Sequence, residues 1–252
     1  MGEGWFFMGV ISILFYGNLN DFLPLERKNR PIQVVFAHKT ALKHVIESLG
    51  VPHPEVGAIH ANSNQVGLAY YIQDQDHMDV YPHTATVFAS ARNQPAFILD
   101  NHLGKLTGYL RFLGIDSVYN PTWDDADLAN FAAQYQRILL TRDRGLLKRK
   151  IITHGYFLRS QLPLNQIAEV VQHFQLSPYI KPFYRCSRCN GILQIVEKER
   201  IMDQLQPLTQ RYFHEFTLCN GCGRIYWKGS HYPKLMELIS RFCGSFSNSP
   251  IK

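Results

Sequence analysis

Four cysteines occur in two pairs whose spacing suits a metal ion. The pairs are Cys186-Ser-Arg-Cys189 and Cys219-Asn-Gly-Cys222, and each CxxC pair can present two thiolates to one tetrahedral zinc ion. The alternatives are two disulfides, which need an oxidising compartment, or a redox CxxC motif, which is not expected in duplicate. We predict one zinc ion. Because four thiolates leave no open coordination position, we expect this zinc to be structural and not to activate water.

A second group of candidates consists of aspartates at the ends of predicted elements. Asp100 ends a short buried strand, Asp143 follows a later one, and a helix between them begins with Asp124, Asp125 and Asp127. Ligands gather at the carboxyl ends of strands in open α/β sheets, so such acids can converge on one place. Carboxylates that lie close together favour Mg²⁺ or Mn²⁺, which can activate water for hydrolysis of a phosphodiester. Asp124 or Asp125 could instead simply cap a helix, and an acid that follows a strand could be a turn residue.

Basic side chains flank these acids in the sequence and could hold phosphate groups. Residues 1–96 contain 6 basic and 8 acidic side chains, whereas residues 181–252 contain 11 and 5. This uneven charge favours a polyanionic partner. The stretch from Lys148 to Lys150 could equally be a solvated helix face. The flanking basic residues are Lys105, Arg111, Arg142, Arg144, Lys148, Arg149 and Lys150.

Alternating strands and helices are expected to position the acids. Apolar runs predict strands at residues 97–99, 115–119 and 138–141, and apolar residues at helical spacing predict helices between and after them. This order implies a parallel sheet of the α/β class. The N-terminal segment has the order strand, strand, helix, strand, strand, with the last two strands expected around 58–60 and 67–72. That order suits a small mixed sheet crossed by one helix.

The composition is that of an ordered, globular protein outside the membrane. Hydrophobic residues make up 46% and charged residues 18% of the chain, and no apolar run approaches the roughly 20 residues of a spanning helix. The apolar N-terminus contains Glu3 and lacks a basic region and a cleavage site, so we expect no signal peptide, with Met8 as an alternative start. We therefore expect a soluble, cytoplasmic protein. Without Walker, GxGxxG or GxSxG motifs, nucleotide-binding and serine-hydrolase functions are disfavoured.

From Phe97 to about Ser240 the sequence resembles the Mut-seven C-terminal ribonuclease domain family, a PIN-like nuclease domain with an attached zinc ribbon. The matching pieces are FILDNHLGKLTGYLRFLGIDSVYN, DDADLANFA, RILLTRDRGLL, CSRCNGIL and CNGCGRIYWKGSHY. From Ile11 to about Pro82, with YGNLNDFLP and ESLGVPHPEV, it resembles the ubiquitin-like domain that often precedes this nuclease. The expected order is therefore a ubiquitin-like β-grasp domain, a PIN-like parallel-sheet α/β domain and a zinc ribbon. Their predicted ranges are 9–83, 96–180 and 181–242, with a linker at 84–95 and a flexible tail at 243–252.

The resemblance implies an active site in which aspartates hold one or two divalent ions, Mg²⁺ or Mn²⁺, for the cleavage of RNA. Asp100, Asp125 and Asp143 match the acids of the family, and Asp127 is a candidate for a fourth. Many PIN nucleases carry a further acid on a helix between the first two, but no glutamate occurs between Asp100 and Asp143 in this chain. The expected RNA-binding residues are Lys105, Arg111, Arg142 and Arg144 and, in the ribbon, Arg188 and Lys228.

Three functions remain open at this point. The first is a metal-dependent ribonuclease, and the second is a non-catalytic RNA-binding or ribosome-associated adaptor that uses the ribbon and the basic surface. The third is an interaction scaffold built around the ubiquitin-like domain. Sulfur carriers and protein modifiers of that fold act through a free C-terminal Gly-Gly, whereas this chain continues past the domain without one. We expect the domain to bind a protein partner or to stabilise the nuclease.

Overall fold

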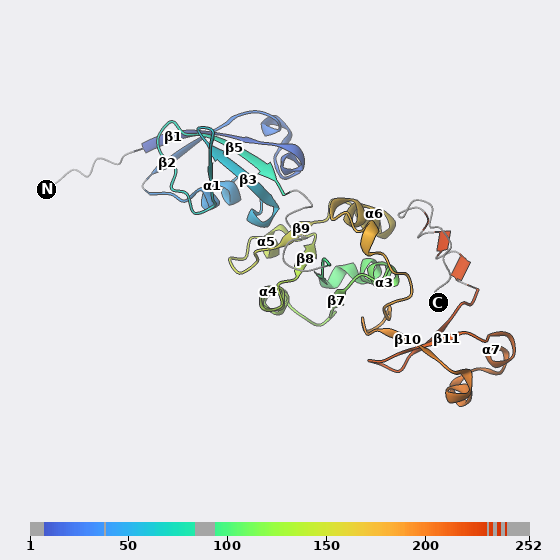
Figure 1. Ribbon diagram of the computed structural model, residues 1–252. Coiled ribbons are helices and arrows are strands. Elements are labelled where there is room, and N and C mark those ends of the chain that lie inside the picture. Colours follow the sequence, from blue (N-terminus) through green and yellow to red (C-terminus); the bar gives the residue numbers. More distant parts are fainter. Residues whose placement is uncertain are drawn as a thin grey trace. The chain divides into compact units, whose positions relative to one another are not determined.

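The computed structural model describes residues 8–37, 39–83, 94–230, 232–233, 236–237 and 240 (Figure 1). Most of the predicted linker at 84–95 and the whole of the predicted tail at 243–252 lie outside these residues. The chain divides into two compact units. One combines the N-terminal segment up to Val87 with Asp124–Phe157, and the other combines Phe88–Trp123 with the chain from Leu158 onward.

The N-terminal segment forms a mixed sheet crossed by one helix, as predicted. Its elements are β1 (Met8–Phe15), η1 (Gly17–Phe22), η2 (Leu25–Arg27), β2 (Ile32–Ala37), α1 (Leu42–Ser48), η3 (His53–Glu55), β3 (Val56–Ala61), β4 (Asn64–Val66) and β5 (His77–Pro82), where η marks a 3₁₀ helix. The five strands have the order β2-β1-β5-β3-β4. β1 is antiparallel to β2 and parallel to β5, while β3 is antiparallel to both β5 and β4.

The alternation of buried and more exposed residues explains how β1 packs one face against the hydrophobic core. Ile11, Ile13 and Phe15 are at most 1% exposed, as expected when every second residue of a strand faces the same side. The strand predicted around 67–72 is wrong, because those residues form turn and coil with one isolated bridge. Asn62 and Ser63, both with positive φ, turn the chain earlier, so that the shorter β4 pairs with β3.

The central part forms a four-stranded sheet with helices, in agreement with the predicted α/β class. Its elements are β6 (Phe97–Leu99), η4 (Asn101–Leu103), α3 (Gly104–Phe112), β7 (Ser117–Tyr119), α4 (Asp125–Gln134), β8 (Ile138–Thr141), α5 (Arg144–Leu147), β9 (Gly155–Phe157), α6 (Pro163–His173) and η5 (Ser177–Tyr179). The strand order is β7-β6-β8-β9. β6 runs parallel to β7, and β8 runs parallel to β9. Three of these strands were predicted, whereas β9 was not.

Burial explains why β6 and β8 could be recognised from the sequence. Every residue of both strands is buried, which is typical of parallel strands that are covered on both faces. β9 has only three residues, and Gly155 begins it, so neither alternation nor a long apolar run marks it. Within the described residues, the helices are all too short or too polar to cross a membrane.

The C-terminal part forms a small antiparallel sheet next to the four cysteines. Its elements are β10 (Leu193–Val196), η6 (Lys198–Arg200), η7 (Met202–Gln204), α7 (Pro207–Tyr212), β11 (Phe216–Cys219) and β12 (Ile225–Trp227). β11 is the middle strand, with β10 and β12 on either side. A separate small hydrophobic cluster in this part of the chain consists of Ile201, Leu205 and Phe216. Two of these residues come from the helical segment between β10 and β11. This arrangement is compatible with the predicted zinc ribbon.

Candidate functional site

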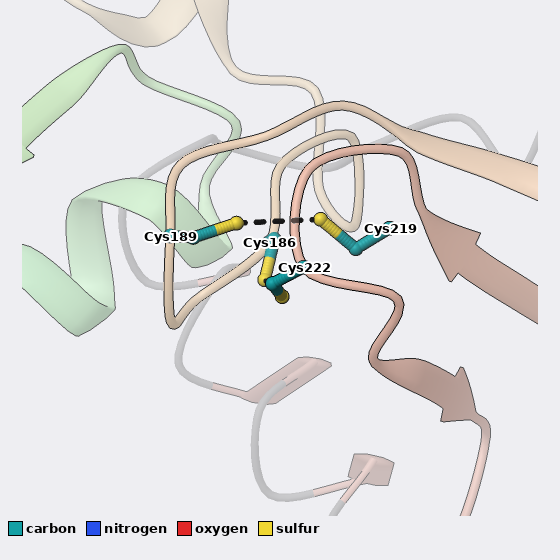
Figure 2. A group of neighbouring side chains, drawn as sticks. All are labelled: Cys186, Cys189, Cys219 and Cys222. Atoms are coloured by element: carbon teal, nitrogen blue, oxygen red, sulfur yellow. Dashed lines mark hydrogen bonds between the residues drawn. The ribbon is translucent and has the colours of Figure 1, made fainter.

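The four predicted cysteines converge on one point. Their sulfur atoms all lie within 4.8 Å of one another, and Figure 2 shows them pointing toward a common centre from two loops. One loop precedes β10 and carries Cys186 and Cys189, while Cys219 ends β11 and Cys222 lies in the loop that joins β11 to β12. In each pair the first cysteine is buried and the second is exposed. The spacing in the sequence therefore becomes a compact four-sulfur cluster.

The distances between the sulfurs fit a tetrahedral metal site. Cys186 Sγ lies 3.7 Å from Cys222 Sγ, and Cys189 Sγ lies 3.4 Å from Cys219 Sγ (Figure 2). A zinc ion with Zn–S bonds of about 2.3 Å requires sulfurs about 3.8 Å apart. A disulfide requires about 2.05 Å. The four cysteines are therefore free thiols whose spacing allows the cluster to hold a zinc ion.

The electrostatics of the cluster also favour a cation. Burial by itself would raise the pKa of Cys186, but the Tyr226 hydroxyl, 3.0 Å from its sulfur, and nearby backbone N–H groups lower that pKa to about 6. Burial, together with hydrogen bonds to the neighbouring thiols, raises the pKa of Cys189 to about 12. Sulfurs this close resist carrying several negative charges at once. A divalent ion removes that repulsion, so the donor set fits zinc.

The first cysteine loop is fastened to the elements around β7. Arg111 on α3 is 4% exposed, and its guanidinium donates to the backbone oxygens of Ser117, at 2.8 Å, and of Arg188, at 2.7 Å. A third bond from Arg111 reaches the oxygen of Ser187 at 3.2 Å. Arg111 was predicted to contact RNA, but the structure places it in the interior as a support for the loop. We therefore leave it out of the proposed RNA-binding surface.

An acid next to β7 completes this attachment. Asp116 accepts a hydrogen bond of 2.8 Å from Asn190 Nδ2, and Arg185 Nη2 lies 3.5 Å from its other oxygen. Asn190 also accepts from the backbone N–H of Ser117. The ribbon thus engages both oxygens of Asp116. The sequence marks Asn190 only by its place directly after a cysteine.

Asp100 is a buried carboxylate at the end of a strand, as expected. It directly follows β6 and is 6% exposed. It precedes η4 without capping it, since its side chain accepts no capping hydrogen bond there. In the described part of the chain, Oδ1 of the next residue, Asn101, is buried and has no hydrogen-bond partner. Asp100 and Asn101 thus place two oxygen-bearing side chains directly after β6.

Asp143 is an exposed helix cap with one oxygen in use. Its Oδ1 accepts from the backbone N–H groups of Gly145, at 2.6 Å, and Leu146, at 3.1 Å, which makes it the N-cap of α5. Among the described residues, these hydrogen bonds leave Oδ2 unused. This capping role of Asp143 is evident only in the folded chain. It does not compete with a ligand role, because it orients the carboxylate.

The acids at the start of α4 divide into two roles. Asp124 is the N-cap and accepts from the N–H groups of Ala126 and Asp127, and Asp127 accepts in return from the N–H of Asp124. This reciprocal capping box explains both residues without a metal. Asp125 takes no part in it, is half exposed, and lies 3.7 Å from Arg149. Asp125 thus remains the acid of this helix that is available to a ligand.

The predicted basic residues lie in different surroundings. Lys105 and Arg188 are exposed. Lys228 is exposed but lies 2.6 Å from a carboxylate oxygen of Glu215. The guanidinium of Arg142 lies 5.9 Å from the centre of the Phe157 ring. Arg144 is held more firmly by aromatic rings and a carbonyl group of the N-terminal segment.

Comparison with known families matches both the N-terminal segment and the part of the chain that contains the central sheet and the cysteine cluster. A family model described as Mut7-C RNAse domain matches residues 95–239, and a model described as Mut7-C ubiquitin matches residues 8–87. The first match includes β6 to β12 and all four cysteines of the cluster. Comparisons with curated proteins and with solved structures gave no match.

Proposed function

The chain belongs to the family of the Mut7-C RNAse domain, here preceded by a Mut7-C ubiquitin domain, and on this premise we propose that it hydrolyses RNA phosphodiester bonds with Mg²⁺ or Mn²⁺. Asp100, Asp125 and Asp143 hold the ion in this proposal. Membership of the family supports a nuclease function. The metal dependence rests on the chemistry of the acids.

The observation that carries the proposal is the buried carboxylate of Asp100. At 6% exposure this carboxylate is largely shielded from water, and it follows a strand of the central sheet at the end where ligands of open α/β sheets gather. The adjacent Asn101 Oδ1 is also buried and is without a hydrogen-bond partner in the described residues. The side chains of these two consecutive residues, at the carboxyl end of β6, offer oxygen ligands of the kind that Mg²⁺ and Mn²⁺ prefer. In ligand type they therefore suit such an ion.

The remaining residues contribute orientation and charge. Asp143 presents an oxygen whose direction is set by the N-terminus of α5, and Asp125 presents a carboxylate outside the capping box. When bound, the metal ion would polarise the phosphate and activate water. Lys105 and Arg142 supply exposed positive charge for the phosphates of the RNA backbone. Asp127 is secondary in this proposal because the capping box already uses it.

The cysteine cluster is proposed to hold a structural zinc ion. All four sulfurs face one point, so no position remains for water or substrate. Arg188, Lys228 and the half-exposed ring of Trp227 supply charge and stacking area near it. We propose that this surface contacts the RNA. We also propose domain limits near 9–83 for the ubiquitin-like domain, 96–180 for the nuclease domain and 181–242 for the ribbon.

An RNA-binding adaptor without catalysis is the second candidate, because the ribbon surface alone would support binding. It predicts binding that weakens with salt, no dependence on added Mn²⁺ and no cleaved product. Cleavage of a labelled RNA with increasing Mn²⁺ therefore separates the two functions.

The decisive variant is Asp143→Asn, with Asp124→Asn as its matched control. Asparagine retains the oxygen that caps a helix, so both variants should fold, and only the negative charge is lost. We expect Asp143→Asn to lose at least about a hundredfold in kcat, while Asp124→Asn keeps its activity. Zinc content measured by mass spectrometry should equal that of the wild type in both. Full cleavage by Asp143→Asn would refute the proposed site.

A further inference from the structure

Two side chains of η3 in the ubiquitin-like domain are buried against the nuclease segment that follows Asp143. His53 is 7% exposed and Glu55 is 3% exposed. Such residues are seldom buried unless they have partners. Glu55 Oε1 accepts a hydrogen bond from the backbone N–H of Phe157 in β9. His53 Nε2 lies 2.7 Å from the backbone oxygen of Ile152, and its Nδ1 lies 2.7 Å from Glu47 Oε1.

A second set of contacts reaches α5 from the same domain. The guanidinium of Arg144 lies 5.2 Å from the centre of the Phe22 ring and 5.4 Å from that of Phe157, and the two rings meet edge to face at 5.5 Å. Arg144 also donates to the backbone oxygen of Phe22 at 3.3 Å. Lys148 Nζ donates to the backbone oxygen of Glu47 at 2.7 Å. Both ends of α5 are thus tied to the N-terminal domain.

The helix held in this way is the one that orients Asp143. α5 consists of four residues, Arg144–Leu147, and a single turn of helix is not stable in isolation. Its first N–H groups, those of Gly145 and Leu146, hold Asp143 Oδ1 at 2.6 and 3.1 Å. Any movement of α5 therefore moves the carboxylate. The residues that hold α5 in place therefore act on Asp143 indirectly, through the N–H groups of Gly145 and Leu146.

We propose that the ubiquitin-like domain fixes the direction of the Asp143 carboxylate through α5 and β9, with Glu55, Phe22 and Lys148 as positioning residues. The consequence for catalysis rests on the proposed function. The domain is then an integral support of the nuclease site, in addition to any partner it binds. A carboxylate that swings away from the ion lowers the rate without changing the RNA-binding surface.

Two conservative variants test this. Glu55→Gln keeps the shape of the side chain but weakens its bond to the N–H of Phe157, and Lys148→Met keeps the stem but removes the bond to Glu47. Glu26→Gln, in an exposed position of the same domain, is the matched control. We expect kcat to fall about tenfold in the first two, an order-of-magnitude figure for a misplaced group. The KM for RNA should stay unchanged, and the Mn²⁺ concentration for half-maximal rate should rise severalfold.

Hydrogen exchange of the Gly145 and Leu146 amides provides a readout that does not depend on cleavage. These amides should exchange at least severalfold faster in the two variants, while amides of β1 keep their wild-type rates, which excludes a general loss of stability. Unchanged exchange and unchanged Mn²⁺ dependence would overturn the inference while leaving the nuclease proposal intact. If the wild type cleaves no RNA, the nuclease proposal fails, and the exchange rates alone decide whether the domain holds Asp143.

Discussion

Replacing Arg111 by methionine tests whether this side chain supports the cysteine loop or contacts RNA. Methionine retains the apolar stem, so the loss is confined to the guanidinium and its three bonds to backbone oxygens. Hydrogen bonds of charged donors contribute about 1.5–3 kcal/mol each. The three are not equal, because Ser187 and Arg188 are exposed and their oxygens can turn to water, whereas Ser117 is fully buried.

Arg111→Met should therefore lose the full contribution of the hydrogen bond to Ser117 and part of the contributions of the bonds to Ser187 and Arg188. We expect the free energy of unfolding to fall by about 2–4 kcal/mol. Urea denaturation of the zinc-loaded protein measures it. A chelator should also remove zinc faster from the variant, because the loop that carries Cys186 and Cys189 is no longer held to Ser117. Arg188→Met is the matched control, since this side chain is exposed. It should weaken RNA binding with little change in stability.

A loss below about 0.5 kcal/mol for Arg111→Met would refute the supporting role, because that is the range of surface substitutions without structural features. Weaker RNA binding at unchanged stability would instead restore the expectation drawn from the sequence, in which Arg111 holds the RNA backbone. The two variants thus predict opposite patterns in the two assays.

Three further predictions concern stability. Gly114→Ala should destabilise the fold by at least about 2 kcal/mol in urea denaturation, because φ is +82° and an added Cβ would lie 2.2 Å from the oxygen of Lys181. Asp124→Ala should cost about 1 kcal/mol through loss of the capping box, whereas Asp124→Asn should be nearly neutral by the same measurement. Burial, together with the nearby His154, lowers the pKa of His83 to about 4. Below about pH 6.5 the imidazole binds a proton in the unfolded chain but not in the folded chain. The free energy of unfolding therefore decreases as the pH is lowered. His83→Asn should remove about 2 kcal/mol of the loss between pH 7 and pH 5.

Features that depend on neighbours in the sequence could be predicted. The cysteine cluster follows from two CxxC pairs, because each pair makes its own loop and only one further contact is needed to join them. β6 and β8 are wholly apolar runs, and the acids Asp100 and Asp143 could be assigned to their ends. The helix-cap alternative could also be stated beforehand, and it describes Asp124 correctly.

Features that depend on distant partners could not be predicted. Arg111 has the same side chain whether it faces RNA or a buried backbone oxygen, and only the folded chain distinguishes the two. Glu55 and Phe157 are 102 positions apart, so nothing in either segment announces their hydrogen bond. β9 is too short to give a pattern of its own, and its place in the sheet depends on pairing with β8.

The unequal exposure of the four cysteines sets an order for attack on the zinc site. Cys189 and Cys222 face solvent, whereas Cys186 and Cys219 are at most 1% exposed. An oxidant or a competing heavy metal therefore meets one sulfur from each loop before it meets the other two. We expect the first oxidised species to retain two inner thiolates, with Cys186 still beside the Tyr226 hydroxyl. Because each CxxC pair would keep one intact thiolate, reduction of the outer cysteines and addition of zinc should restore the site without refolding the chain.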